Sequence, residues 1–235
     1  MIDAITSSQL AMNSDKLQLS AVSQNIANMH TPGFKRELAI QAPFDKLVDT
    51  DLETVASQLQ VAQLHRQATL DKTNRPLDVA LSGEGYFTVQ TDDGVHYTRR
   101  GDFKRNSKGE LVTFDDQRVM GKGGAIRIDG NEFQIKKDGT IIIDNKPSYQ
   151  LNVVKFTSSA HLQALSNGYF QSQQTPQPMD ASISVHQGYL EQSNVKSVEE
   201  MLMMTKLARH FEASQRVMKT ADEMLSQAVS QLGEG

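Results

Sequence analysis

Side chains that could do chemistry are present in this chain, but their spacing is poor for it. The six histidines stand far apart, and none forms a pair with metal-ligand spacing. Asp92-Asp93 and Asp115-Asp116 are paired acids of the kind used in acid–base catalysis, yet both stand beside turn residues, which predicts solvated turns. Gly83–Gly85 and Gly121–Gly124 lack the full spacing of a phosphate loop. Because cysteine is also absent, we expect no catalytic, cofactor-binding or metal site.

The N-terminal segment that would position such groups has helical periodicity over residues 1–30. Its apolar residues recur every seven positions, and the matching earlier positions of the second row are the polar Ser8 and Asp15. The stripe consists of Ile5, Met12, Leu19 and Ile26, joined by Val22 and Met29. Pro32 disfavours helix at the residue before it and Gly33 tolerates positive φ, so we expect the helix to end there.

A second amphipathic helix is predicted over residues 194–232. Its stripe is an uninterrupted heptad series of Met204, Phe211, Met218, Leu225 and Leu232. A parallel row, beginning at Leu207, is mostly small and would let another helix approach closely. Two interpretations remain open: the two helices pair and cap the middle of the same chain, or they bury their stripes against other chains.

Between the helices the pattern changes to short β-like runs separated by turn signals. Residues 86–90 and 95–98 predict a hairpin, as do 103–105 with 111–114 and 133–135 with 140–143. Residues 149–156 alternate like a further strand. We therefore predict an α+β protein with a central antiparallel β domain, barrel or sandwich-like, flanked by the two helices. The expected parts are an N-terminal helix (1–33), a connector (34–74), the β domain (75–190) and a C-terminal helix (191–235), with either helix or extended chain at 45–64.

Charge and hydropathy exclude several classes of protein. The formal net charge of −4 argues against a nucleic-acid binder. The basic pairs Lys35-Arg36, Arg99-Arg100 and Lys136-Lys137 are scattered, and we interpret them as solvated surface. No run approaches the roughly 20 apolar residues of a membrane span. The first residues have neither a basic start nor an apolar core, so we expect no cleavable secretory signal.

Four segments together resemble the bacterial flagellar rod and hook proteins. Asn25-Ile26-Ala27-Asn28 followed by Thr31–Arg36 is similar to the family's N-terminal signature. Arg75–Leu81 with Gly85–Val89 is similar to its central motif, and Tyr97–Phe103 to the strand pair that follows. Gly188–Val195 is similar to the segment that leads into the C-terminal helix. The motifs occur in the family's order and span nearly the whole chain.

The resemblance implies a structural subunit of the flagellar basal-body rod and no enzyme. Motif details and length favour the proximal rod, and a distal-rod subunit is the alternative. Such subunits are exported by the flagellar (type III) export apparatus, and their partners are other axial rod subunits and copies of themselves. They are required for motility. In the assembled rod, across the periplasm, their terminal helices pack together as a coiled coil lining the channel, with the β domain outside.

The resemblance also assigns assembly roles to particular residues. The N-terminal set comprises the stripe residues Ile5, Met12, Leu19 and Val22 and the signature residues Asn25, Ile26, Ala27, Asn28, Thr31, Pro32, Gly33 and Phe34. The C-terminal set is Met204, Leu207, Phe211, Met218, Leu225 and Leu232. The β-domain motif contributes Arg75, Pro76, Leu77, Asp78, Gly85 and Phe87. Two rival hypotheses are a peptidoglycan-cutting enzyme, for which no convincing acid–base pair is present, and a membrane-surface protein, for which the helices lack a basic polar face.

Overall fold

A computed structural model describes residues 2–40, 60–130, 132–157 and 162–233. The chain divides into two compact units. The helical unit comprises Met1–Ala27, Glu37–Leu64 and Lys196–Gly235, and the β unit comprises Asn28–Arg36 and His65–Val195. Both units are therefore discontinuous in sequence.

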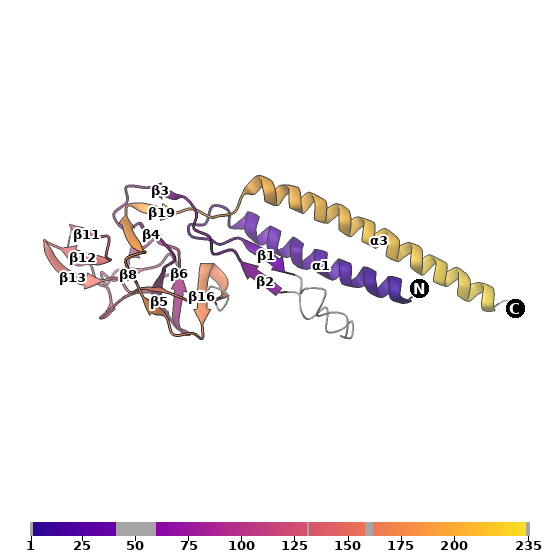
Figure 1. Cartoon of the computed structure of the whole chain (residues 1–235), viewed down its shortest axis with the longest axis horizontal. Helices are drawn as coiled ribbons and strands as arrows, with labels where there is room; N and C mark the ends of the chain where they lie inside the picture. Colours follow the sequence, from indigo (N-terminus) through magenta and orange to yellow (C-terminus); the bar gives the residue numbers. More distant parts are fainter. Residues whose placement is uncertain (1, 41–59, 131, 158–161, 234–235) are drawn as a thin grey trace. The chain divides into compact units, whose positions relative to one another are not determined.

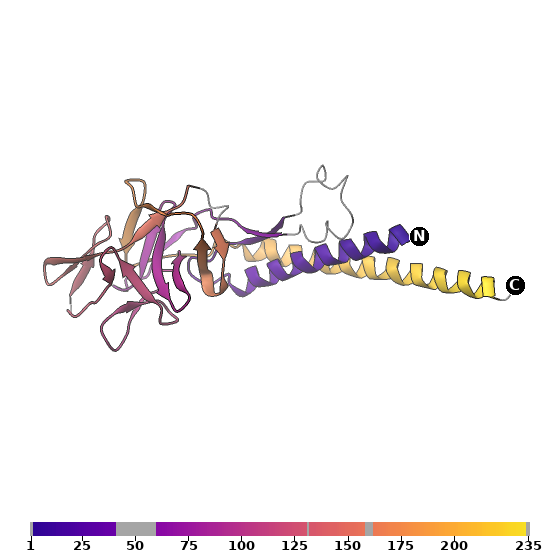
Figure 2. The ribbon, with the colours of Figure 1, turned by 90° about the horizontal axis from the view of Figure 1, so that it is seen from below.

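Two long helices form most of the helical unit. Helix α1 (Ile2–Ala27) and helix α3 (Ser197–Gly233) lie side by side and run in opposite directions (Figures 1 and 2). Neither has a described stretch long and apolar enough to cross a bilayer. Two hydrogen-bonded pairs set their register, Asn25 with Glu200 and Asp15 with His210. Because ten residues separate the members on each helix, the antiparallel register stays constant between the two pairs.

The inward face of α3 follows the predicted heptad rows. Leu207 is buried, and Phe211, Ser214 and Met218 are half-buried. Met204 departs from the pattern, because 40% of its surface is exposed. On α1, Val22 is buried together with Ala21, while Met12, Leu19 and Ile26 are half-buried. The side-chain surroundings of Ile5, Leu225 and Leu232 lie outside the described part of the chain.

Helix α1 ends at Ala27, three residues before the predicted end. The chain turns already at Asn28, whose carbonyl accepts the Thr31 N–H at 3.0 Å, while the Thr31 hydroxyl donates to the Asn28 side chain at 3.1 Å. Such side-chain bonding competes with helical bonding at a helix end. The turn therefore begins at asparagine, and Pro32 and Gly33 continue it.

A two-stranded ribbon completes the helical unit. Strands β1 (Glu37–Ile40) and β2 (Gln60–Gln63) pair antiparallel, with Glu37 opposite Gln63. The helical interpretation of residues 45–64 is wrong at 60–63, which are extended, and its remainder at 45–59 lies outside the described residues. An isolated ribbon of this size is marginal in water, so its packing against α1 stabilises it.

The β unit contains most of the strands. They are β3 (Leu70–Lys72), β4 (Val79–Ser82), β5 (Tyr86–Thr91), β6 (Gly94–Thr98), β7 (Lys104–Arg105), β8 (Leu111–Val112), β9 (Arg118–Gly121), β10 (Gly124–Ala125), β11 (Phe133–Ile135), β12 (Thr140–Ile143), β13 (Lys146–Gln150), β14 (Val153–Lys155), β15 (Leu162–Ala164), β16 (Tyr169–Ser172), β17 (Gln177–Pro178), β18 (Ser184–Gln187) and β19 (Tyr189–Glu191), with a short 3₁₀ turn at Ser166–Gly168. All three predicted hairpins occur, as β5–β6, β7–β8 and β11–β12. The predicted strand at 149–156 is interrupted after Gln150, where β13 ends and the chain moves to β14 in another sheet.

The sheets are open, so the barrel alternative is wrong for the described residues. The main sheet follows the order β15-β16-β6-β5-β9-β8-β7, and its end strands do not pair with each other. Closure needs every strand to carry two neighbours. Instead β5 divides its second edge between β9 and β14, and β8 meets β9 only at Val112 and Arg118. Short separate sheets, β11-β12-β13, β18-β4 and β19-β3, complete the unit.

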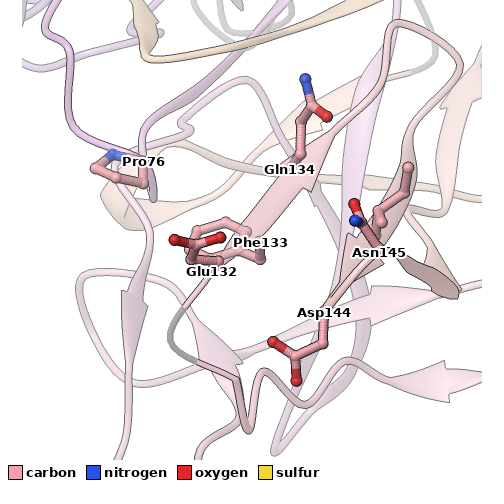
Figure 3. A pocket seen from close by; sticks show the side chains of 7 residues that line it. Pro76, Glu132, Phe133, Gln134, Asp144 and Asn145 are labelled. Carbon is pink, nitrogen blue, oxygen red and sulfur yellow. The ribbon is translucent and has the colours of Figure 1, made fainter.

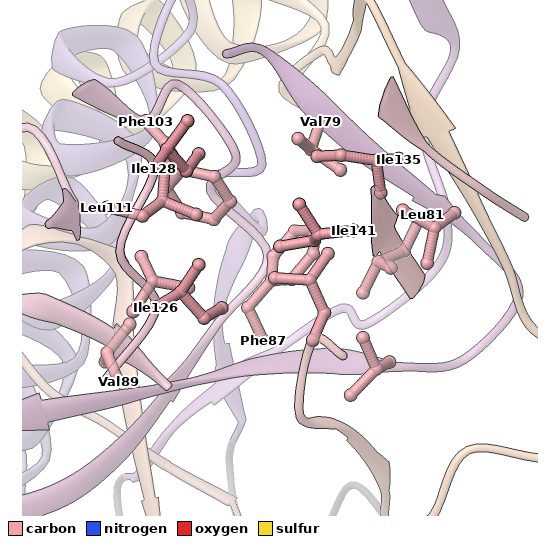
Figure 4. Close-up of a cluster of buried hydrophobic side chains, with 14 of the residues drawn as sticks. Val79, Leu81, Phe87, Val89, Phe103, Leu111, Ile126, Ile128, Ile135 and Ile141 are labelled. Atoms are coloured by element: carbon pink, nitrogen blue, oxygen red, sulfur yellow. The ribbon is translucent and has the colours of Figure 1, made fainter. Parts of the chain in front are cut away.

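One large apolar core holds these sheets together (Figure 4). Phe87 lies in it edge-on to Phe103, with ring centroids 5.1 Å apart. The other labelled members are Val79, Leu81, Val89, Leu111, Ile126, Ile128, Ile135 and Ile141. Full burial of side chains of this size contributes about 1.5–3 kcal/mol each relative to exposure. The core therefore holds the strands that carry the polar motifs in fixed positions within the β unit.

Candidate functional site: an amide clamp and a buried ion cluster

The first feature of the site is an amide clamp made by Asn25, Glu37 and Glu200 in the helical unit. The Asn25 side chain accepts the Glu37 N–H at 2.7 Å and donates to the Glu37 carbonyl at 2.9 Å. Its amide also donates to the Glu200 carboxylate at 3.1 Å. Asn25 and Glu200 are 1% and 0% exposed. One side chain thus ties α1 to the start of β1 and to the first turns of α3.

A second polar pair joins the helices further along. Asp15 is buried and bonds His210 Nδ1 at 2.6 Å. In the sequence, Asp15 is a polar residue at a position where the heptad pattern calls for an apolar one. In the structure it occupies an inward position and has a specific partner on α3.

The tight turn that follows α1 belongs to the β unit. Gly33 has φ +69°, and a Cβ atom placed there would lie 2.6 Å from the backbone carbonyl carbon of Arg99. The Gly33 N–H donates to the Glu191 carbonyl at 2.8 Å. Phe34 is buried, and Pro32 is half-buried. Only glycine combines this backbone conformation with so close an approach.

Beneath the turn lies an ion cluster formed by Lys35, Arg99 and Glu191. Lys35 Nζ is 2.7 Å from Glu191 Oε1, and Arg99 Nε is 3.2 Å from Oε2. The three side chains are between 0% and 3% exposed. The expectation that Lys35-Arg36 and Arg99-Arg100 are solvated pairs is therefore wrong for their first members. These cations are buried because a carboxylate and backbone carbonyls surround them.

Two uncharged side chains, His65 and Tyr86, lie next to the cluster. His65 Nδ1 and the Tyr86 hydroxyl are 2.8 Å apart. Burial, with Lys35 and Arg99 nearby, lowers the pKa of His65 to about 4, so the ring is neutral at pH 7. Burial also raises the pKa of Tyr86, and burial is the main cause that lowers the pKa of Lys35.

The central motif lies beside this cluster in the β unit. Asp78 is fully buried and forms an ion pair with Arg75 at 3.3 Å, while its backbone carbonyl accepts the Gly188 N–H at 2.7 Å. The Arg99 guanidinium donates to the Gly85 carbonyl at 2.5 Å. Phe87 belongs to the core, and Leu77 packs against it. Thus segments from four motifs that the sequence places far apart meet in one unit.

Features expected of an enzyme are weak in the described residues. No group of three His, Asp or Glu side chains there could hold a metal ion. Asp92-Asp93 is an exposed turn, and Asp115 accepts hydrogen bonds from Thr113 and Tyr169.

A hollow of about 480 Å³ is lined by residues on and beside β11 and β12, with Pro76 (Figure 3). Its acids, Glu132 and Asp144, are both exposed, so neither has the dry setting that tunes a catalytic carboxyl.

Sequence reasoning missed the charged members of the site: Asp15, Lys35, Arg99, Glu191 and Glu200. Three of them, Lys35, Arg99 and Glu191, lie within recognised motifs, but a charged residue in a short polar motif normally indicates surface. The available signal was Asp15, because a polar residue at a stripe position predicts an inward polar contact. The pairing partners are more than 60 positions apart and leave no local pattern.

Comparison with known proteins agrees with these motifs. Residues 5–35 match the family described as flagella basal body rod protein, and residues 80–143 match the flagellar hook protein FlgE/F/G D1 domain. Residues 186–232 match the C-terminal domain of the flagellar basal body rod FlgEFG proteins. The flagellar basal-body rod protein FlgF of Salmonella typhimurium is 36% identical over 88% of each chain, and that of Escherichia coli 34% over 90%. FlgG of Buchnera aphidicola from Acyrthosiphon pisum is 31% identical, over 99% of this chain and all of the relative.

These relatives are structural proteins and not enzymes, which removes the peptidoglycan-cutting hypothesis. The three matched ranges take in most of both helices and part of the β unit. They include Asn25 and Glu200 of the clamp, the turn at residues 31–35 and the whole ion cluster, whereas Glu37 lies just outside them. The chain belongs to the flagellar basal-body rod protein family and is a structural rod subunit close to FlgF.

Proposed function

We propose that this chain builds the proximal part of the rod by packing its α1–α3 pair against neighbouring axial subunits and copies of itself. The supporting observation is the apolar surface that α3 leaves uncovered within the chain. Val198 is 69% exposed, Leu202 60% and Val217 56%. By helical spacing Val198 and Leu202 lie on the side opposite the row of Leu207 and Phe211 that faces α1, and Val217 lies on the flank of that row. Exposed apolar stripes on a long helix are typical of helix–helix interfaces.

The rest of the assembly follows the same reasoning. Interfaces between successive subunits are heterologous, and such interfaces generate helical cylinders rather than closed dimers. In this proposal the helices line the export channel of the drive shaft as a coiled coil, and the β unit lies outside. The subunit reaches that place in the periplasm through the flagellar export apparatus. Among the residues assigned to assembly, the buried Val22 and Leu207 hold the two helices of one chain together, and the exposed Met204 is available for contacts with neighbouring subunits.

Charge placed on the uncovered face of α3 tests the proposal. We expect Leu202→Lys and Val217→Lys to leave the purified monomer folded, as judged by circular dichroism, and to stop rod assembly and motility in cells. Gln215→Lys is the matched control, because it adds the same charge at an exposed position that is already polar. Normal rods with both lysine variants would contradict the proposal.

A distal-rod subunit is the second candidate. The observation that favours it is the FlgG relative, which aligns over its whole length. Complementation separates the two: expression in a strain lacking its proximal-rod subunit should restore swimming, and expression in one lacking its distal-rod subunit should not. The reverse result would move this chain to the distal rod.

A further inference from the structure

The ion cluster of the β unit is unbalanced. It contains two cations, Lys35 and Arg99, and the carboxylate of Glu191 stands between them. Each carboxylate oxygen serves one cation, Oε1 at 2.7 Å from Lys35 and Oε2 at 3.2 Å from Arg99. The remaining contacts of the cations are neutral: Lys35 donates to the Arg66 carbonyl at 3.1 Å, and Arg99 to the Gly83 carbonyl at 2.8 Å.

Glu191 also holds backbone from two other segments. Its carbonyl accepts the Gly33 N–H at 2.8 Å, and its Oε1 accepts the Ala68 N–H at 2.9 Å. Glu191 is the last residue of β19, where it stands opposite Leu70 of β3. Pairing of β19 with β3 therefore brings the carboxylate into place together with the strand.

An unpaired charge in such a site is far more costly than a missing ion pair. Removing one partner of a buried pair leaves the other charge without compensation, whereas removing a surplus charge does not. Loss of the Glu191 carboxylate would leave two buried cations facing each other. Loss of the Lys35 charge would leave one balanced pair between Arg99 and Glu191.

We propose that Glu191 forms a conformational lock. In this lock, docking of the turn at residues 31–35 depends on pairing of β19, the last strand of the β unit, with β3. Before β19 pairs with β3, Lys35 and Arg99 repel each other, and the turn stays undocked. When β19 pairs, the carboxylate neutralises both cations and the Glu191 carbonyl binds Gly33. The beginning and the end of the β unit are thereby fixed in a single step.

Hydrogen exchange on the full-length chain, read by mass spectrometry, tests the lock. In Glu191→Gln we expect exchange at residues 31–35 and at Ala68 to accelerate at least tenfold, while the β9–β10 region changes less than threefold. In Lys35→Met, which cuts the same 2.7 Å contact, we expect less than a threefold change at Ala68. The double variant should exchange more slowly than Glu191→Gln alone, because it removes one of the two uncompensated cations.

The control is Asp129→Asn, which removes a carboxylate from the exposed Arg127–Asp129 pair and should change nothing beyond its own loop. Equal effects of Glu191→Gln and Lys35→Met would overturn the proposal, since an ordinary ion pair predicts that symmetry. Uniform acceleration across the β unit in Glu191→Gln would also overturn it. If Glu191→Gln fails to fold while Lys35→Met folds, the asymmetry supports the lock; if both fail, the lock is rejected.

Discussion

The amide clamp predicts that replacing the buried Asn25 strongly destabilises the helical unit, and Asn25→Ala measures this effect. The substitution removes two bonds to the Glu37 backbone, at 2.7 and 2.9 Å, and one to the Glu200 carboxylate at 3.1 Å. Neutral bonds contribute about 1 kcal/mol each and a bond to a charged group about 1.5–3 kcal/mol. Alanine regains about 0.5 kcal/mol of helix propensity. We therefore expect the helical unit to lose about 3–4.5 kcal/mol of unfolding free energy.

Urea unfolding followed by the helical circular dichroism signal is the appropriate assay, because that signal comes mainly from α1 and α3. The matched control is Asn13→Ala, the same change at an exposed position of the same helix, which we expect to alter stability by no more than about 0.5 kcal/mol. A difference between the two variants below about 1 kcal/mol would refute the reasoning.

Asn25→Asp gives the clamp a charge test. It keeps the shape of the side chain but places a second carboxylate about 3 Å from that of Glu200. Repulsion raises the pKa values of such a pair in the folded state. The destabilisation should therefore be full at pH 7 and diminish as the pH falls, measured as the urea midpoint against pH. A destabilisation that does not diminish on acidification would argue against contact between the two groups.

The remaining predictions concern the β unit. A Cβ atom at Gly101 would lie 1.7 Å from the Val79 carbonyl oxygen, whereas one at Gly123 would have nothing within 4 Å. We expect Gly101→Ala to lower the unfolding free energy by about 3 kcal/mol. Gly123→Ala should be nearly neutral in the same thermal unfolding assay. Because the pKa of His65 falls to about 4 on folding, the unfolded state binds more protons than the folded state between pH 6.5 and 4. Acidification through this range should therefore lower the unfolding free energy by up to about 3 kcal/mol, and by less to the extent that solvent screens the ring. In His65→Phe this part of the pH dependence should vanish. Tyr169→Phe removes hydrogen bonds to Thr113 and Asp115 and should lower the unfolding free energy by about 1–2 kcal/mol. An unchanged unfolding free energy would show that water replaces the hydroxyl.

Local patterns predicted the parts of the fold that local forces determine. The heptad series around Leu207 and Phe211 determines which side of α3 faces α1, and turn residues determine each hairpin. The end of α1 was misplaced because the Asn28 side chain competes with helical bonding before Pro32 is reached. The sequence left a barrel and a sandwich-like arrangement open, because closure of the sheet depends on which distant strands share the edges of β5.

The charged part of the site could not be predicted for a different reason. Burial of Lys35 depends on a carboxylate 156 positions away in the sequence, at Glu191. Nothing in the local sequence distinguishes this lysine from one on the surface, because the desolvation cost is offset only in the folded unit. The motifs were therefore recognisable before their physical role was.

The interleaved chain path has a consequence for dissecting the protein into parts. The chain passes between the helical and β units after Ala27, Arg36, Leu64 and Val195, so four covalent connections join the two. Neither unit therefore corresponds to one continuous stretch of the sequence. The first two crossings border the turn at residues 28–36, which belongs to the β unit although it lies between two segments of the helical unit in the sequence. An isolated fragment of residues 65–195 would therefore lack the turn, and with it the Lys35 side chain that Glu191 binds.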